Sequence, residues 1–355
     1  MSSSSTTLPG RLGSPDMTLR HDPRADPRMI AAMEPFGLAD AEAEAPVDAA
    51  SSIEDLRDYC RQAEEGFELL FAALVAGLPE VDGVTRSVET IRGVDGNDVT
   101  LYLHRPVEDG TDRVGVLHLH GGGMVLLEAA GAAYAGLRDE LAARGMVVVG
   151  VEFRNGGGKH GDHPFPAGLH DCTSAVRWMN ENRERLGIRA VVISGESGGG
   201  NLTLATALEA TRDGDQVDGV YAMCPYISGA YAAVPEELTS LRENDGYFLS
   251  CRTMGGLARI YDPDGEHASD PLAWPLHASI EDLRRLPPHV ISVNELDPLR
   301  DEGLAYHRKL TEAGVESRSR VVAGTCHAGD LIFRDAMPDV FDATVDDIAA
   351  FANSR

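Results

Sequence analysis

Lysine is nearly absent from this chain, which has only Lys159 and Lys309 among its 31 basic residues, against 57 Asp and Glu. The resulting net charge of −26 repels phosphate backbones and anionic lipid, so we expect no nucleic-acid partner and no membrane-surface partner. No run of about 18 apolar residues occurs, so no membrane span is expected. The first residues lack the basic and apolar stretches of a secretory signal, which favours a cytoplasmic protein.

Cysteine is also scarce, and its five positions are scattered, odd in number and without a C-x-x-C pair. This pattern excludes a disulfide framework and a zinc ribbon. Two histidine-containing stretches, His118-x-His120 and His160–His163, supply no convincing set of metal ligands. We therefore expect neither a metal nor another cofactor.

Strand-like and helix-like patterns alternate from about residue 87, which predicts an α/β fold with a parallel sheet covered on both faces. Residues 1–28 are rich in Ser, Pro, Gly and Asp and are expected to form a mobile tail. Residues 225–288 contain seven prolines and interrupt the alternation, which predicts an inserted lid with short helices. The expected strands are 87–93, 99–105, 114–120, 146–153, 190–194, 217–224, 289–293 and 317–322. The expected helices are 28–36, 52–77, 129–144, 168–186, 199–212, 301–313 and 339–351.

The strongest local motif is Gly195-Glu196-Ser197-Gly198-Gly199, which fits the pattern G-x-S-x-G. An apolar strand precedes it and a helix rich in small residues follows it, as in a nucleophile elbow. Such a sharp turn exposes the serine hydroxyl at the carboxyl edge of the sheet, beside the positive end of the helix dipole. We therefore predict Ser197 as a nucleophile.

A second motif, His120-Gly121-Gly122-Gly123, follows the expected strand 114–120. Three glycines let the backbone turn its N–H groups towards a negatively charged oxygen, as in the oxyanion loop of lipases and esterases. Gly122, Gly123 and Gly198 are the expected N–H donors. We expect His120 to orient this loop rather than to act as a base.

A nucleophilic serine needs a histidine base, and the histidine needs an orienting carboxylate. Asp297 and His327 each follow an expected strand of the same sheet, in the order Ser, acid, His that α/β-hydrolases use. Asp301 and Asp330 remain as alternative acids, although Asp301 suits the N-terminal cap of the following helix better.

Together these motifs resemble the hormone-sensitive lipase-like family of α/β-hydrolase esterases, over residues 85–355. The resemblance implies an α/β-hydrolase fold with an eight-stranded, mostly parallel sheet and a helical cap. It places an N-terminal tail and cap helices in residues 1–80, the catalytic domain in 81–224 and 276–355, and an inserted cap segment in 225–275. The chain departs from the family pattern where Glu196 stands for Asp, Gly198 for Ala and Ala328 for Gly, and where residues 153–158 replace a Tyr-Arg-x-Ala-Pro-Glu stretch.

These features predict a serine carboxylic-ester hydrolase with a Ser197–His327–Asp297 triad. Its expected partner is a small-molecule ester of small to medium size, with lactones as a further candidate. Amide hydrolysis, acyl transfer and a non-catalytic ligand receptor remain alternatives, and a homo-oligomer is left open. The residues expected to contact the substrate are Met124, Glu196, Tyr226, Tyr247 and Phe248.

Overall fold

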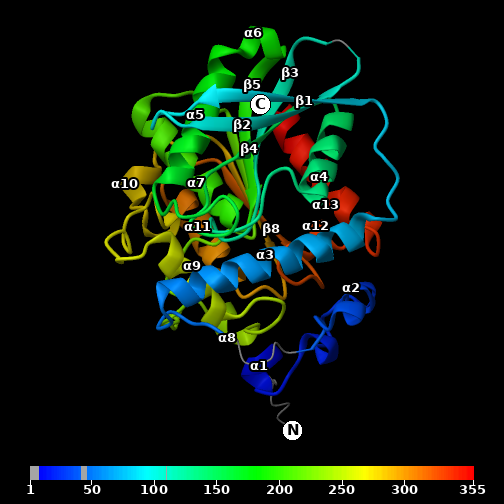
Figure 1. The fold of residues 1–355 in the computed structure, drawn as a ribbon, viewed down its shortest axis with the longest axis vertical. Coiled ribbons are helices and arrows are strands. Elements are labelled where there is room, and N and C mark those ends of the chain that lie inside the picture. Colours follow the sequence, from blue (N-terminus) through cyan, green and yellow to red (C-terminus); the bar gives the residue numbers. More distant parts are fainter. Residues whose placement is uncertain (1–7, 41–45, 109) are drawn as a thin grey trace.

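The computed structural model describes residues 8–40, 46–108 and 110–355. Its centre is an eight-stranded sheet with the strand order β1-β2-β4-β3-β5-β6-β7-β8 (Figure 1). Strand β2 pairs antiparallel with β1 and β4, and all other neighbours run parallel, so the predicted α/β class with a mostly parallel sheet is confirmed. The strands are β1 (Val84–Arg92), β2 (Asp98–Pro106), β3 (Arg113–Leu119), β4 (Val147–Glu152), β5 (Ile188–Glu196), β6 (Gly219–Met223), β7 (His289–Asn294) and β8 (Ser317–Val322).

Different helices cover the two faces of the sheet. Helices α4 (Ala132–Ala143) and α13 (Pro338–Asn353) pack on one face, against side chains such as Val116. Helices α5 (Ala167–Glu181), α7 (Gly198–Asp213) and α11 (Arg300–Glu312) pack on the other, against side chains such as Leu117. Because successive strand residues point to opposite faces, a nearly continuous apolar strand is needed to bury both.

Helix α3 (Ile53–Val75) crosses one end of the sheet, beside α9 (Cys251–Tyr261) (Figure 1). The Ser52 hydroxyl accepts the backbone N–H of Asp55 at 3.1 Å, which caps the helix where the sequence predicts its start. The segment 225–288 contains α8 (Ser240–Glu243), α9, the 3₁₀ turn Pro275–His277 and α10 (Ile280–Leu283), in agreement with the short helices expected there.

The expectation of a mobile tail over residues 1–28 is wrong for its described part; residues 1–7 lie outside the described residues. From α1 (Gly10–Gly13) onward the chain packs on the body of the protein, and Leu19 is fully buried. The Arg24 guanidinium binds the carboxylates of Asp22 and Glu243. The segment then continues through the 3₁₀ turn Leu19–His21 into α2 (Pro27–Met33) and a second 3₁₀ turn, Glu34–Phe36. The N-terminal segment is held by residues that are distant in the sequence. The polar composition of the segment itself does not predict these contacts.

The predicted helix 168–186 is divided at Asn182, where α5 ends and α6 (Arg183–Leu186) begins. The Trp178 carbonyl accepts both the backbone N–H of Asn182, at 3.0 Å, and the side-chain amide of Asn182, at 2.8 Å.

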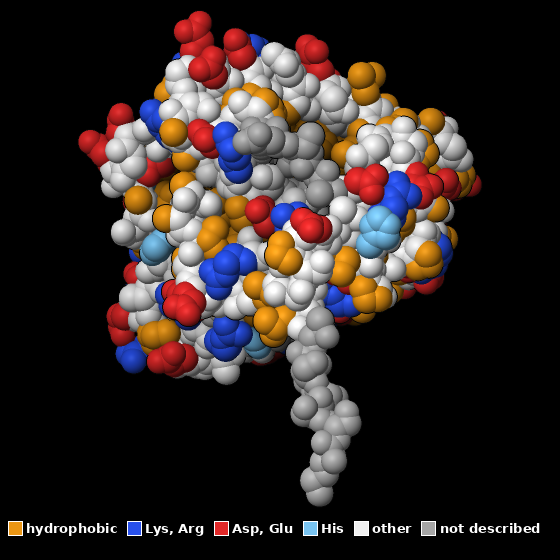
Figure 2. Space-filling view, turned by 90° about the horizontal axis from the view of Figure 1, so that it is seen from below, with side chains coloured by type: hydrophobic (Ala, Val, Ile, Leu, Met, Phe, Trp, Pro, Cys, Tyr) orange, Lys and Arg blue, Asp and Glu red, His pale blue; other side chains and the backbone are white. Residues whose placement is uncertain are grey.

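Acidic and basic side chains are interspersed over the face shown in Figure 2. Within the described part of the chain, every helix is too short or too polar to cross a membrane.

Candidate active site

Ser197 stands at the turn between β5 and α7, with φ 58° and ψ −119°. A positive φ is strained for a side chain larger than glycine, and its presence here matches the geometry of a nucleophile elbow. The turn is held by the backbone, because the Ser197 N–H donates to Met223 at 2.9 Å and its carbonyl accepts from Asn201 at 3.0 Å. Gly195 is needed beside it, since a Cβ there would lie 2.5 Å from the Leu119 carbonyl oxygen.

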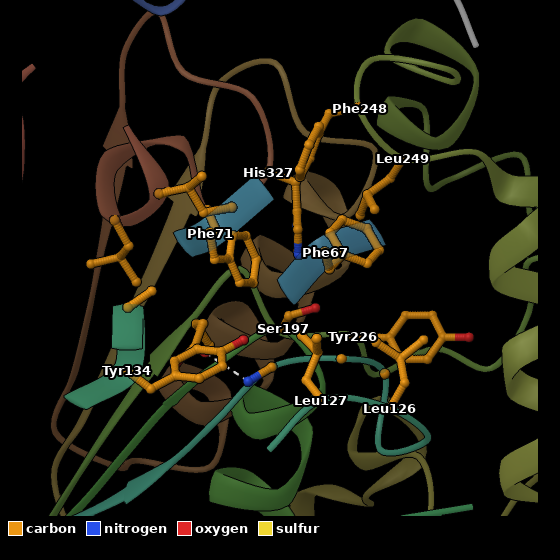
Figure 3. Close-up of a pocket in the computed structure, with 18 of the residues that line it drawn as sticks. Phe67, Phe71, Leu126, Leu127, Tyr134, Ser197, Tyr226, Phe248, Leu249 and His327 are labelled. Atoms are coloured by element: carbon orange, nitrogen blue, oxygen red, sulfur yellow. Dashed lines mark hydrogen bonds between the residues drawn. The ribbon is translucent and has the colours of Figure 1, made fainter. Parts of the chain in front are cut away.

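Asp297 and His327 meet through a hydrogen bond of 2.8 Å between Oδ2 and Nδ1. Asp297 is fully buried, and its other carboxylate oxygen accepts the backbone N–H of Leu299 at 2.9 Å. These bonds fix the carboxylate and leave Nε2 of His327 free to face the pocket, in which the ring points towards Ser197 (Figure 3). The three predicted residues therefore follow the ends of β5, β7 and β8, and Ser197 and His327 line the same pocket.

The two alternative acids bind other groups. Asp301 accepts the Ser240 N–H at 2.8 Å, and Asp330 accepts from Asn294 and Thr344. The expectation that Asp301 caps α11 is wrong, because Leu299 occupies the N-cap and Asp301 lies in the first turn.

The glycine loop after β3 lies directly against the start of α7. Gly122 and Gly123 have φ of 99° and 62°, in the region that favours glycine. A Cβ on Gly198 would lie 2.6 Å from the Gly123 nitrogen and 2.5 Å from the Met124 nitrogen. The backbone of the elbow at Gly198 therefore lies close to the backbone of the loop at Gly123 and Met124.

The carboxylate of Glu196 supports this glycine loop. Its Oε1 accepts the Gly121 N–H at 2.6 Å, and its Oε2 lies 3.4 Å from Nε2 of His118. His120 contacts the next peptide group of the loop, with Nδ1 2.8 Å from the Gly121 carbonyl oxygen. Burial lowers the pKa of His120 to about 3, so the ring is neutral at pH 7 and suits an orienting role.

A largely apolar pocket opens over Ser197 and His327 (Figure 3). Of the residues expected to contact the substrate, Glu196, Tyr226 and Phe248 line this pocket. The other two do not. Met124 is packed in the core, and Tyr247 is fully buried with its hydroxyl donating to Asp22 at 3.1 Å.

The sequence interpretation missed most of the pocket wall. Phe67 and Phe71 come from one face of α3, where a spacing of four residues signals an apolar face but not what that face contacts. The remaining lining residues that were missed include Leu126, Leu127, Tyr134, Leu249, Met254, Leu257, Leu331 and Ile332.

One group of three side chains with metal-ligating atoms occurs among the described residues, formed by Cys224, Asp297 and His327 within 4.8 Å of one another. Asp297 and His327 already bind each other, and burial raises the pKa of the Cys224 thiol well above its usual value. A protonated thiol is a poor ligand, so we assign no metal to this group.

Comparisons with known proteins agree with this architecture. Residues 116–330 match a family described as alpha/beta hydrolase fold. The chain is 31% identical over 276 residues to an ethyl acetate hydrolase of Pseudomonas putida, covering 75% of this chain and 80% of the relative. It is 31% identical over 236 residues to an arylesterase of Saccharolobus solfataricus, covering 65% of this chain and 72% of the relative.

Among solved structures, brefeldin A esterase, described as a bacterial homologue of human hormone-sensitive lipase, superimposes with a TM-score of 0.94 and 48% identity over 98% of both chains. The resemblance inferred from the motifs is thereby confirmed. The chain belongs to the α/β-hydrolase family of esterases related to hormone-sensitive lipase.

Proposed function

We propose that the protein is a serine carboxylic-ester hydrolase. The observation that carries this proposal is the 2.8 Å bond between Asp297 and His327 at an apolar pocket that also contains Ser197 and the glycine loop. Such a pocket takes a neutral ester without steering by charge. The relatives named above, an arylesterase and an ethyl acetate hydrolase, support the ester class.

In the proposed mechanism, His327 takes the Ser197 hydroxyl proton while the serine oxygen attacks the ester carbonyl carbon. Asp297 keeps the proton on Nδ1 and stabilises the imidazolium. The N–H groups of Gly122, Gly123 and Gly198 donate to the oxyanion. His327 then protonates the leaving alcohol, and water, deprotonated by the same histidine, releases the acid and restores Ser197.

In the same proposal, the helices of residues 1–80 and 225–275 form a cap over the catalytic domain. Support comes from Phe67 on α3 and Met254 and Leu257 on α9, which line the pocket beside the triad residues. The cap then determines which esters fit. Esters of small to medium size are the leading substrates, and lactones are a further candidate.

Replacing Ser197 by alanine tests the proposal. Loss of the nucleophile from such a unit lowers kcat by about 10⁶, so Ser197→Ala should not turn over p-nitrophenyl acetate measurably. Its circular dichroism and urea midpoint should stay close to those of the wild type. Undiminished hydrolysis by the variant would refute the assignment.

Labelling by a fluorophosphonate separates an enzyme from a receptor of the same fold, because only an activated serine reacts. Wild type should label and Ser197→Ala should not. A panel of ethyl acetate, brefeldin A and matched anilides, run with and without added alcohol, then separates simple ester, lactone, amide and acyl-transfer activities.

A further inference from the structure

A second hollow adjoins the catalytic pocket. Phe71, Leu127, Ala133 and Tyr134 line both spaces, so these side chains form the wall between them. We refer to the second hollow as the annex. Its lining consists of Glu68, Phe71, Ala72, Leu127, Glu128, Gly131, Ala132, Ala133 and Tyr134.

The wall is closed by an aromatic contact between two elements. Phe71 on α3 and Tyr134 on α4 meet edge to face, with ring centroids 6.2 Å apart and an interplanar angle of 78° (Figure 3). Tyr134 also packs against His120, with the two ring centroids 5.5 Å apart. Phe71 is half-buried and has Phe67 at 5.8 Å on its other side. Removing the Phe71 ring therefore opens the wall without touching the glycine loop.

The annex has both apolar and charged lining residues. Leu127 and three alanines supply apolar surface, and the half-buried Glu68 and Glu128 supply two carboxylates. Lys159 pairs with Glu68 and lies 3.9 Å from Glu128, which holds both carboxylates at the surface. An uncharged hydrocarbon chain matches the walls, and a chain that ends in a carboxylate is disfavoured by the two glutamates.

We infer that the contact between Phe71 and Tyr134 sets an upper limit on the length of the ester chain that the catalytic pocket accepts, and that the annex would hold the end of a longer apolar chain once this contact is removed. This inference rests on the proposed esterase function. Each methylene newly buried in the annex can raise kcat/KM by up to about fourfold.

The test is a series of p-nitrophenyl esters from acetate through butyrate and octanoate to dodecanoate, with kcat/KM measured for each. Wild type should lose activity towards the long end. Phe71→Ala should raise the ratio of dodecanoate to butyrate turnover by at least about tenfold. Phe71→Leu, which removes less packing, should raise it less and serves as the milder variant if Phe71→Ala unfolds.

Phe67→Ala is the matched control. Phe67 lies one turn away on α3 and lines the catalytic pocket, but it is not part of the annex. Its removal enlarges the pocket but leaves the contact between Phe71 and Tyr134, so the length ratio should rise clearly less than in Phe71→Ala. Ala132 lines the annex alone, and Ala132→Phe added to Phe71→Ala should fill the annex and cancel the gain.

Alkyl acetates with butyl to dodecyl alcohols, assayed on the same variants, show whether the acyl or the alcohol end enters the annex, and a gain in either series supports the inference. A wild type that already prefers dodecanoate, or equal ratios for the Phe71 and Phe67 variants, would overturn it. Failure of the esterase proposal looks different, because wild type would then not hydrolyse even the acetate in a Ser197-dependent way.

Discussion

The sulfur of Met29 accepts a hydrogen bond of 3.3 Å from the backbone N–H of Cys326, the residue before His327. Three residues earlier on the N-terminal segment, the Asp26 N–H donates to the Gly324 carbonyl at 2.9 Å. The loop that carries the proposed base is therefore held by a segment from the far end of the sequence. Asn244 makes a similar link, donating to the Asp297 carbonyl at 3.1 Å and accepting from Arg24 at 3.3 Å.

Arg24 is expected to anchor this N-terminal segment. Arg24 forms ion pairs with two buried carboxylates, those of Asp22 and Glu243. Arg24→Ala removes both ion pairs, and Glu243 then keeps only its ion pair with Arg300. Removing one member of a buried ion pair costs about 3 kcal/mol or more, and we expect a loss of about that size in the free energy of unfolding from urea titrations. The exposed pair of Arg61 and Asp58 is the control, because Arg61→Ala should change stability by less than about 1 kcal/mol. Equal losses would contradict the anchoring role.

Gly198 should not tolerate alanine, although alanine is frequent at this position in the family. The added Cβ would lie 2.5 Å from the Met124 nitrogen and would push the glycine loop away from the elbow. Loss of one oxyanion donor lowers kcat by about 10²–10³, so Gly198→Ala should fall in that range with p-nitrophenyl acetate. Gly66→Ala is the control, since open space surrounds Gly66 on α3 and alanine there should stabilise by up to about 1 kcal/mol. A fully active Gly198→Ala enzyme would show that this close approach is not needed.

Glu196 is expected to position the glycine loop through its acceptor oxygen. Glu196→Ala removes the acceptor of the Gly121 N–H and should lower kcat by about 10², with a smaller change in KM. Glu196→Gln keeps an oxygen at that place and should remain within about tenfold of the wild type. Steady-state kinetics on p-nitrophenyl butyrate measure both variants. If Gln and Ala lowered kcat equally, the negative charge rather than the hydrogen bond would be the important property.

Glu302 should make stability fall as the pH rises. Burial raises its pKa to about 8, although its Oε1 accepts from the Ile227 N–H at 2.7 Å and the Tyr231 hydroxyl at 2.8 Å. In the unfolded chain a glutamate titrates near pH 4.3, so between about pH 4.3 and 8 only the folded state holds the proton. This contribution to stability is complete below about pH 4.3 and is lost as the pH rises towards 8.

Glu302→Gln keeps the acceptor and cannot ionise. Its stability relative to the wild type should therefore increase with pH, by up to about 1.4 kcal/mol per unit between pH 5 and 8. Urea unfolding of both proteins at pH 5.5, 7 and 8.5 measures this difference. A constant difference across the three pH values would mean that Glu302 is ionised in the folded protein.

Local patterns were sufficient where neighbouring residues determine the structure. The turn Asp95-Gly96-Asn97 separates the expected strands 87–93 and 99–105, and β1 and β2 pair antiparallel up to Arg92 and Asp98, with Gly96 at φ 78°. The elbow and the glycine loop are local in the same sense, because each depends on backbone freedom at a few adjacent glycines. The proximity of Asp297 and His327 followed from parallel strands, whose carboxyl ends share one edge of the sheet.

Interactions between distant segments could not be predicted in this way. The aromatic sequence around Tyr247 suggested a pocket wall, but its hydroxyl binds Asp22, which is 225 residues away in the sequence. Helical spacing placed Phe71 on an apolar face, and this spacing is the same whether the face meets a solid core or a cavity. The N-terminal segment was misjudged for a related reason, since its composition is polar and its few buried side chains find their partners far along the chain.

The hydrogen bond between Met29 and Cys326 has a consequence for the order of assembly. It joins residues 297 positions apart, so during synthesis at about 5–20 residues per second, Met29 waits about 15 to 60 s for its partner. Closing so long a loop is slow compared with forming the local strands and helices. Docking of the N-terminal segment is therefore expected among the last steps of folding, and recovery of ester hydrolysis after dilution from urea should lag behind recovery of secondary structure.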